Sequence, residues 1–194
     1  MKNITKIVEQ IEKECQEIGF DQVSNQEVGR LLETLCASKP HGKFLELGTG
    51  CGLTTVWIAE GMDEQSRLIS VDNDEKVIAI AKKYLSEDER ITLICDRGES
   101  VIDGIENNTV DLIFADTWPG KYHYLEEALA LLKVGGIYVI DDMLPQENWP
   151  EGHAEKADAL VAYLHQRDDL KVVALDWATG VMIATKTAIK NRPC

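Results

Sequence analysis

One short stretch constrains the fold of this chain more than any other, and it reads Phe44-Leu45-Glu46-Leu47-Gly48-Thr49-Gly50-Cys51-Gly52. A mostly apolar run of strand length leads into three glycines in a G-x-G-x-G spacing, and a helical pattern follows at once. A strand that passes through a glycine-rich turn into a helix brings backbone N–H groups against a ligand. The stretch therefore predicts a ligand-binding turn at the carboxyl end of a buried strand.

The position of the third glycine separates two ligand classes. A dinucleotide fingerprint, G-x-G-x-x-G, would need its third glycine at position 53, which is Leu53. The third glycine here is Gly52, and this shorter spacing suits a ligand without a pyrophosphate, such as S-adenosylmethionine. An NAD-linked oxidoreductase is disfavoured for the same reason.

Carboxylates follow the next two predicted strands. Asp72 lies about 20 residues after Gly52, where an acidic side chain can accept hydrogen bonds from both ribose hydroxyls of an adenosine. An aspartate after a strand is also a common helix cap, and Asp74 could fill that role instead. Asp96 follows the third strand, where contact with an adenine amino group and a plain cap both stay open.

The hydrophobic pattern predicts an α/β fold, a doubly wound and mostly parallel seven-stranded sheet. Two amphipathic helices come first, the second opened by a capping box over Ser24–Glu27. A helix over 122–132, a turn over 134–136 and a strand over 137–140 are expected near the end of the parallel part. The C-terminal strands, 171–175 and 181–184, should form an antiparallel hairpin. One domain over 1–194 is expected, with N-terminal helices in 1–40 and the core in 43–186.

A second set of acidic residues follows strands four and five. Asp116 ends the apolar run 110–115, and Asp141 and Asp142 end the next strand. If the strands are neighbours, three carboxylates converge beside the ligand turn, and oxygen ligands of this kind suit Mg²⁺, Mn²⁺ or Ca²⁺. Acidic residues after strands are also frequent as caps and turn formers.

Candidate general bases and candidate pocket-lining residues lie close to these carboxylates in the sequence. Lys121, His123 and His153 are candidate general bases, although each could equally be a solvated surface group. Trp118 and Trp149 could line an acceptor pocket or serve only in packing.

These motifs resemble those of the class I S-adenosylmethionine-dependent methyltransferases, and most of all the cation-dependent O-methyltransferase group of catechol and caffeoyl-CoA enzymes. The resemblance covers roughly residues 22–186, and it is carried by 45–52, 111–122 and 132–142. It implies a Rossmann-like methyltransferase fold, S-adenosylmethionine as cofactor and a small catechol-like acceptor hydroxyl. The implied cofactor contacts are Val23, Glu46, Gly48, Thr49, Gly50, Gly52, Thr54, Asp72, Asn73, Asp96 and Asp116. The implied ligands of a divalent cation are Asp116, Asp141 and Asp142.

The chain departs from that group at two positions. The group's strand-five motif usually ends in Asp-Asn, whereas this chain has Asp141-Asp142. Catechol-type enzymes place a catalytic lysine directly after the tryptophan, where this chain has Pro119 and the nearest lysine is Lys121. Three alternatives therefore remain: a metal-independent methyltransferase acting on N or O, an RNA-nucleoside methyltransferase, and a cofactor-binding protein without catalysis.

Composition limits the partners. The formal net charge is −14, which disfavours nucleic-acid and anionic-membrane binding, because both need a positive face. The five cysteines are scattered and show no C-x-x-C spacing, and no signal peptide or apolar span is evident, so a reducing cytoplasm is the expected location. A small-molecule acceptor is the expected partner. The apolar first helix could pack on its own domain or against a second copy, which leaves a homodimer open.

Overall fold

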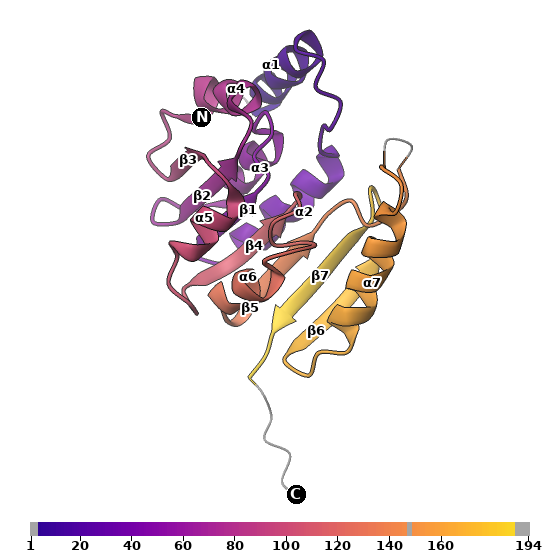
Figure 1. Cartoon of the computed structure of the whole chain (residues 1–194). Coiled ribbons are helices and arrows are strands. Elements are labelled where there is room, and N and C mark those ends of the chain that lie inside the picture. Colours follow the sequence, from indigo (N-terminus) through magenta and orange to yellow (C-terminus); the bar gives the residue numbers. More distant parts are fainter. Residues whose placement is uncertain (1–3, 147–148, 189–194) are drawn as a thin grey trace, which may run out of the picture.

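The computed structural model describes residues 4–146 and 149–188. Within these ranges the elements alternate along the chain (Figure 1). Their order is α1 (Ile4–Glu17), α2 (Gln26–Ala37), β1 (Lys43–Leu47), α3 (Leu53–Gly61), β2 (Arg67–Asp72), α4 (Glu75–Leu85), β3 (Ile91–Cys95), α5 (Gly98–Asp103), β4 (Val110–Ala115), α6 (Leu125–Leu131), β5 (Leu132–Ile140), α7 (His153–His165), β6 (Leu170–Leu175) and β7 (Val181–Lys186).

The described strands form one sheet in the order β3-β2-β1-β4-β5-β7-β6. Strands β1 to β5 run parallel, and β7 lies antiparallel between β5 and β6. The predicted doubly wound sheet with a C-terminal antiparallel hairpin is confirmed. The direction of winding reverses between β1 and β4, and ligands in such sheets bind at that switch point.

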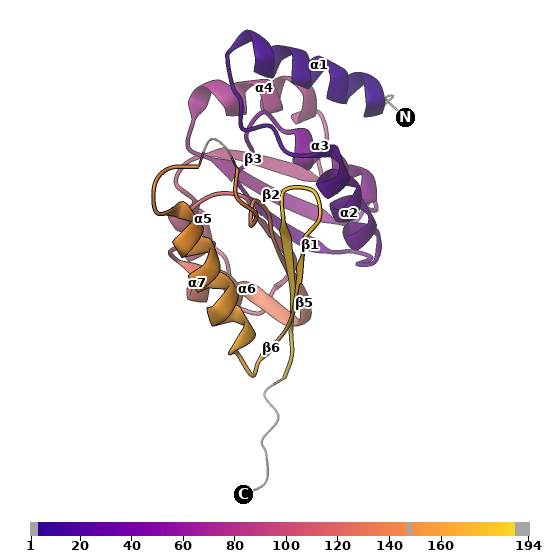
Figure 2. The ribbon, with the colours of Figure 1, turned by 90° about the vertical axis from the view of Figure 1, so that its right-hand side faces the viewer.

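Helices cover both faces of the sheet. Figure 2 shows α5, α6 and α7 on one face and α2 and α3 on the other. The first group packs on a core that includes Leu47, Ile113 and Tyr138, whereas α2 and α3 pack on Phe44, Phe114 and neighbouring side chains. Helix α1 lies outside α3 and α4, and its buried side chains form a third hydrophobic cluster with side chains of these two helices.

The end of the parallel part differs from the prediction. Helix α6 begins at Leu125, because Tyr124 has a left-handed backbone (φ 56°) that no helix can continue through. The expected turn over 134–136 lies inside β5. Leu132 pairs with Val110 and Ile137 pairs with Leu112, so the residues between them form a bulge.

The second helix also begins differently. Its N-cap is Asn25, whose side chain accepts a hydrogen bond from the Glu27 amide at 2.7 Å. The predicted capping box at Ser24 is therefore wrong, and the Ser24 hydroxyl instead donates to the Asp116 carboxylate at 3.3 Å. This bond links the segment before α2 to the end of β4.

Candidate active site

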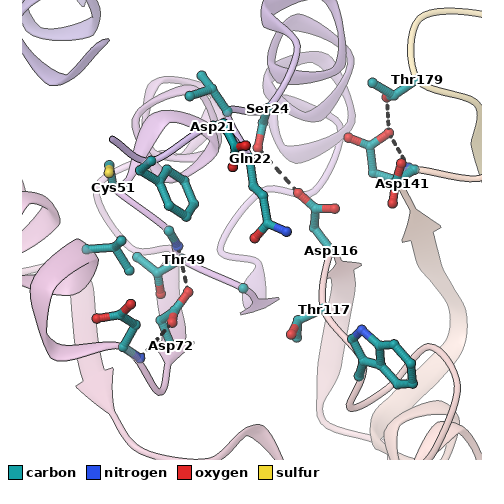
Figure 3. A pocket seen from close by; sticks show the side chains of 18 of the residues that line it. Asp21, Gln22, Ser24, Thr49, Cys51, Asp72, Asp116, Thr117, Asp141 and Thr179 are labelled. Carbon is teal, nitrogen blue, oxygen red and sulfur yellow. Dashed lines mark hydrogen bonds between the residues drawn. The ribbon is translucent and has the colours of Figure 1, made fainter. Parts of the chain in front are cut away.

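A cavity of about 530 Å³ lies at the carboxyl ends of β1, β2, β4 and β5. The glycine turn and the segment 20–24 contribute to its wall (Figure 3). The loop before α7 also lines the cavity. In Figure 3, Asp72 and Thr49 lie on one side, Asp141 and Thr179 on the other, and Asp116 between them. The carboxylates that the sequence placed at separate strand ends therefore share one cavity.

The glycine turn has two functions. Gly48 (φ +102°) lines the cavity, and a Cβ there would lie 2.9 Å from the Asp116 carbonyl oxygen, so only glycine lets β1 and β4 approach this closely. Gly52 (φ +93°) is not among the lining residues, and its Cβ would lie 2.9 Å from the Ala81 Cβ. The last glycine of the motif therefore serves the packing of α4, whereas Gly48, Thr49 and Gly50 form the cavity wall.

Asp72 is held by backbone donors. Its two oxygens accept the Gly50 amide at 2.8 Å and the Asp74 amide at 2.9 Å. Asp74, not Asp72, is the N-cap of α4, with its side chain accepting the Lys76 amide. The carboxylate at position 72 is thus fixed at the cavity edge, next to the exposed Asn73, and its remaining lone pairs can accept from a ligand.

A smaller cavity of about 270 Å³ adjoins the first. It shares Gly48, Asp72 and Asn73 with the larger one and extends to Asp96. Asp96 accepts the Arg97 amide at 2.7 Å, and Arg97 itself is the N-cap of α5. Asp96 is therefore not the cap of α5 and lies in a cavity continuous with the Asp72 edge.

Glu46 and Thr54, two of the predicted cofactor contacts, do not line the described cavities. Glu46 is fully buried and accepts hydrogen bonds from Thr55 at 2.6 Å and Ser70 at 2.5 Å. Burial raises the pKa of Glu46 to about 7, against the hydrogen bonds from these hydroxyls. Glu46 ties β1 to β2 and α3 behind the turn, and a direct contact with a ligand is not supported.

Replacing Glu46 by Gln is expected to remove a pH dependence of stability. The unfolded chain releases this proton near pH 4.5, but the folded chain holds it up to about pH 7, so stability falls over that window as pH rises. The loss is on the order of 3 kcal/mol. Urea unfolding of wild type and Glu46→Gln at pH 5 and pH 8 measures it, with the exposed Glu60→Gln as control. If the free energy of unfolding changes equally between pH 5 and pH 8 in wild type and Glu46→Gln, a protonated Glu46 is contradicted.

The N-terminal segment reaches the cavity as expected. Val23 is 40% exposed and lines the cavity, next to Ser24 and its bond to Asp116. Phe20 lies beside the glycine turn, because a Cβ on Gly50 would meet its ring at 3.6 Å. The segment before α2 therefore forms one wall over the turn.

The acidic residues at the ends of β4 and β5 do converge. Asp141 donates its amide to the Ala115 carbonyl at 3.2 Å, which places it beside Asp116. Burial first, and the neighbouring Asp141 second, raise the pKa of Asp116 well above its ordinary value. Burial likewise raises the pKa of Asp141, against hydrogen bonds from Thr179 and the Asp142 amide.

Lys121 lies among these carboxylates rather than at the surface. Its side chain is 3% exposed, and its Nζ is 3.8 Å from an Asp142 carboxylate oxygen. Burial lowers the pKa of Lys121, and the charges of Asp116, Asp142 and Asp141 act in the opposite direction. The lysine that the sequence left as a distant candidate is therefore part of the site.

The predicted metal ligands are engaged by other groups of the protein in this arrangement, and the Lys121 ammonium already lies beside Asp142. Both Asp142 oxygens accept the Trp149 indole N–H at 2.9 Å, and an Asp141 oxygen accepts its neighbour's amide. Over residues 4–146 and 149–188, no group of three or more His, Cys, Asp or Glu side chains is arranged to hold a metal ion. The metal assignment of Asp116, Asp141 and Asp142 is thus not supported.

Aromatic side chains form the opposite wall. The His153 ring stacks on Trp149 with centroids 4.2 Å apart, and its Nε2 is 2.7 Å from the Tyr122 hydroxyl. Trp118 packs edge-on against Tyr122 at 5.5 Å. All four line the cavity, so both candidate tryptophans are wall residues.

The two candidate histidines differ in environment. His153 is 7% exposed, burial lowers its pKa, and its Nδ1 is buried without a hydrogen-bond partner in the described part of the chain. His123 is exposed, faces Glu99 at 3.0 Å and lines only the smaller cavity. His153 is therefore the histidine placed for chemistry in the larger cavity.

Sequence reasoning missed several wall residues. Tyr122 and Thr179 are the clearest, since one binds His153 and the other donates to Asp141. Tyr122 directly follows the candidate base Lys121 in the strand-four motif, and this position could have identified it as a site residue. Thr179 lies in the hairpin between β6 and β7, and no local pattern connects it to β5.

Comparisons with known proteins agree with this fold. A family model described as a methyltransferase domain matches residues 45–143, which run from β1 to just past β5. This chain belongs to that methyltransferase family.

Relatives and solved structures extend the likeness. A protein of Mycolicibacterium vanbaalenii, provisionally named an O-methyltransferase, is 33% identical over 129 residues, which are 64% of this chain and 57% of that protein. One of Mycobacterium ulcerans with the same provisional name is 30% identical over 118 residues, 58% of this chain and 53% of that protein. The chain thus spans about half the length of the curated relatives it matches.

Two solved structures share the fold. The O-methyltransferase TomG of Streptomyces achromogenes, involved in tomaymycin synthesis and solved with S-adenosylmethionine, has a TM-score of 0.82 at 19% identity, covering 94% of this chain and 90% of its own. A Bacillus cereus O-methyltransferase solved with S-adenosylhomocysteine has a TM-score of 0.81 at 17% identity, covering 94% and 91%. Among the described helices of this chain, none has the length and apolar character that crossing a membrane needs.

Proposed function

We propose that this protein transfers a methyl group from S-adenosylmethionine to a hydroxyl oxygen of a small acceptor. The observation that carries the proposal is one cavity with two unlike halves. One half is the glycine turn with the fixed Asp72 carboxylate, and the other is an aromatic wall with Lys121 and His153. Methyl transfer needs this pairing, because a cofactor and an acceptor must be held in line and close together.

The cofactor half suits an adenosine with a sulfonium. Asp72 is placed to accept ribose hydroxyls, and the adjoining cavity at Asp96 offers an acceptor for an adenine amino group. The sulfonium would lie beside Gly48 and Asp116, and a bound cation there would favour the ionised form of this carboxyl, whose pKa burial raises. Relatives and structural neighbours named as O-methyltransferases, two of them solved with this cofactor or its product, support the proposal.

The acceptor half suits a small aromatic hydroxyl compound. Trp118, Tyr122 and Trp149 offer ring faces and edges of the kind that pack against an aromatic ring. The net charge of −14 disfavours an RNA substrate. A catechol-like compound is therefore the proposed class of acceptor. None of the proposed chemical steps uses a divalent cation.

The proposed step conserves atoms and charge. A lone pair of the acceptor oxygen forms the new O–C bond, the C–S bond breaks, and its electron pair stays on sulfur to give S-adenosylhomocysteine. The hydroxyl proton passes to the Tyr122 oxygen while Tyr122 gives its own proton to Nε2 of His153. This route uses the 2.7 Å contact between Nε2 and the Tyr122 hydroxyl, because the other ring nitrogen is buried and has no hydrogen-bond partner in the described part of the chain. A lowered pKa keeps His153 neutral and ready to accept the proton near pH 7.

Cofactor binding tests the proposal first. S-adenosylmethionine and S-adenosylhomocysteine are expected to raise the melting temperature, and NAD is not, as measured by differential scanning fluorimetry. Asp72→Ala should weaken S-adenosylhomocysteine binding by about tenfold or more, because hydrogen bonds to a charged group contribute ~1.5–3 kcal/mol. Asp158→Ala, an exposed carboxylate on α7, is the matched control for charge. Stabilisation by NAD alone, or unchanged affinity in Asp72→Ala, would refute the assignment.

A further inference from the structure

The ammonium of Lys121 lies where the strand-four and strand-five carboxylates meet. It donates to the carbonyl oxygens of Asp141 at 2.7 Å and Asp142 at 3.0 Å. An ammonium has three N–H donors, so one remains beyond these two bonds. Because Lys121 also lines the larger cavity, that donor can reach a ligand bound there.

The backbone around Lys121 holds this position. Gly120 has φ +83°, and a Cβ there would lie 2.4 Å from Leu47. The buried Tyr138 hydroxyl donates to the Gly120 carbonyl at 2.5 Å, and the Lys121 amide donates to the Trp118 carbonyl at 3.1 Å. The lysine therefore points inward because of a turn that the core fixes, and not because a long surface side chain has folded over.

The charges around Lys121 need a cation. Asp116, Asp141 and Asp142 all act electrostatically on its ammonium, and Asp141 is itself buried. Buried carboxylates without a counterion are strongly unfavourable, so a cation stabilises this part of the site. The protein supplies that cation from its own chain.

We propose that the Lys121 ammonium takes the place of the divalent cation in the acceptor half of this cavity. It neutralises the carboxylates of Asp116, Asp141 and Asp142, and its third N–H holds the acceptor oxygen and stabilises the charge that develops there as the proton leaves. This inference rests on the proposed methyl transfer. It accounts for the absence of lysine at Pro119, because the working ammonium comes from two positions further along the same turn.

Manganese binding by the protein alone tests the inference. Wild type, titrated with MnCl₂ and followed by electron paramagnetic resonance, is expected to show no saturable site at the cavity, and its melting temperature should be equal in MgCl₂ and EDTA. Lys121→Ser removes the charge and opens room for an ion. This variant should bind Mn²⁺ at least about tenfold more tightly than wild type, because the carboxylates are then left without a counterion and each oxygen keeps a lone pair beside its hydrogen bond.

Two further variants separate this effect from general charge loss. Lys133→Ser also removes a lysine that pairs with an aspartate, Asp111 at 2.7 Å, but away from the cavity, and it should gain no Mn²⁺ affinity. Adding Asp141→Asn to Lys121→Ser should abolish the gained site. If Lys121→Ser does not fold, Lys121→Met takes its place, and the wild-type titration still decides.

The outcomes are distinct from those of the proposed function. A stoichiometric Mn²⁺ site in wild type that Asp141→Asn removes would overturn the role of Lys121, even if S-adenosylhomocysteine binds as expected. Equal Mn²⁺ affinity in wild type and a folded Lys121→Ser would also overturn it. Failure of S-adenosylhomocysteine to bind would instead count against methyl transfer.

Discussion

Replacing His153 by Gln is expected to lower kcat for methylation by about 100-fold or more, with little change in S-adenosylhomocysteine affinity. Removing a positioned proton acceptor usually costs a factor of this size. The ring receives the acceptor proton through Tyr122 at 2.7 Å, so Tyr122→Phe should lower kcat comparably. The measurement is steady-state kinetics with the best acceptor from a panel of small catechols and phenols.

Non-additivity is the sharper part of this prediction. If Tyr122 and His153 act as one relay, the double variant should be about as slow as either single variant, as for groups that work as a unit. Matched controls come from α7 itself, where His165→Gln and Tyr163→Phe alter exposed side chains outside the cavity. If the fold-losses in kcat of the two single variants multiply in the double variant, the two groups act separately.

The pH profile gives a second readout of the same relay. Burial lowers the pKa of His153, so the neutral ring that accepts the proton persists below pH 6.5. The fall in kcat on the acidic side of the pH profile should therefore lie below pH 6.5, and it should disappear in His153→Gln. Melting temperatures of all variants check that loss of the stacking on Trp149 has not unfolded the loop.

Replacing Phe114 by Ala is expected to cost about 3–5 kcal/mol of folding free energy, the usual range for a fully buried phenylalanine. Phe114 lies near the carboxyl end of β4, the central strand of the sheet, and pairs with Glu46 of β1 and Val139 of β5. It is completely buried beneath α2 and α3. Truncation leaves a cavity in the middle of the sheet, which the rigid neighbouring strands cannot close.

Urea unfolding at constant m-value measures this loss. Phe114→Leu keeps most of the volume and should cost about 1.5 kcal/mol or less. Because Asp116 follows two residues later in the same chain segment, Phe114→Ala should also weaken cofactor binding, while Phe114→Leu should not. A loss below 1 kcal/mol for the alanine variant would contradict a tightly packed centre.

The cofactor half was largely readable from the sequence. The glycine spacing with Leu53 and the carboxylate at Asp72 are local features, and their roles depend on a strand, a turn and a helix that follow one another in the chain. The doubly wound, mostly parallel sheet followed from the alternation of strands and helices. Glu46 was predicted as a cofactor contact, and the structure buries it behind the turn; because β1 is buried on both faces, hydropathy could not tell which face its side chain takes.

The acceptor half was not readable in the same way. Three carboxylates at strand ends predicted a metal site, and Lys121 was only one of three candidate bases near them in the sequence. That placement depends on a left-handed Gly120, on Tyr138 from β5 and on the long reach of one side chain. Likewise, Ser24 and Thr179 reach the carboxylates from distant segments.

By itself, the sequence determined the strand-turn-helix unit with its Gly48 to Gly52 spacing, because backbone conformation and a short chain separation leave few alternatives there. Only the tertiary structure decided which charges face one another across the ends of β4 and β5. Such contacts join residues far apart in the chain, and their energies depend on burial and distance, which no local pattern records.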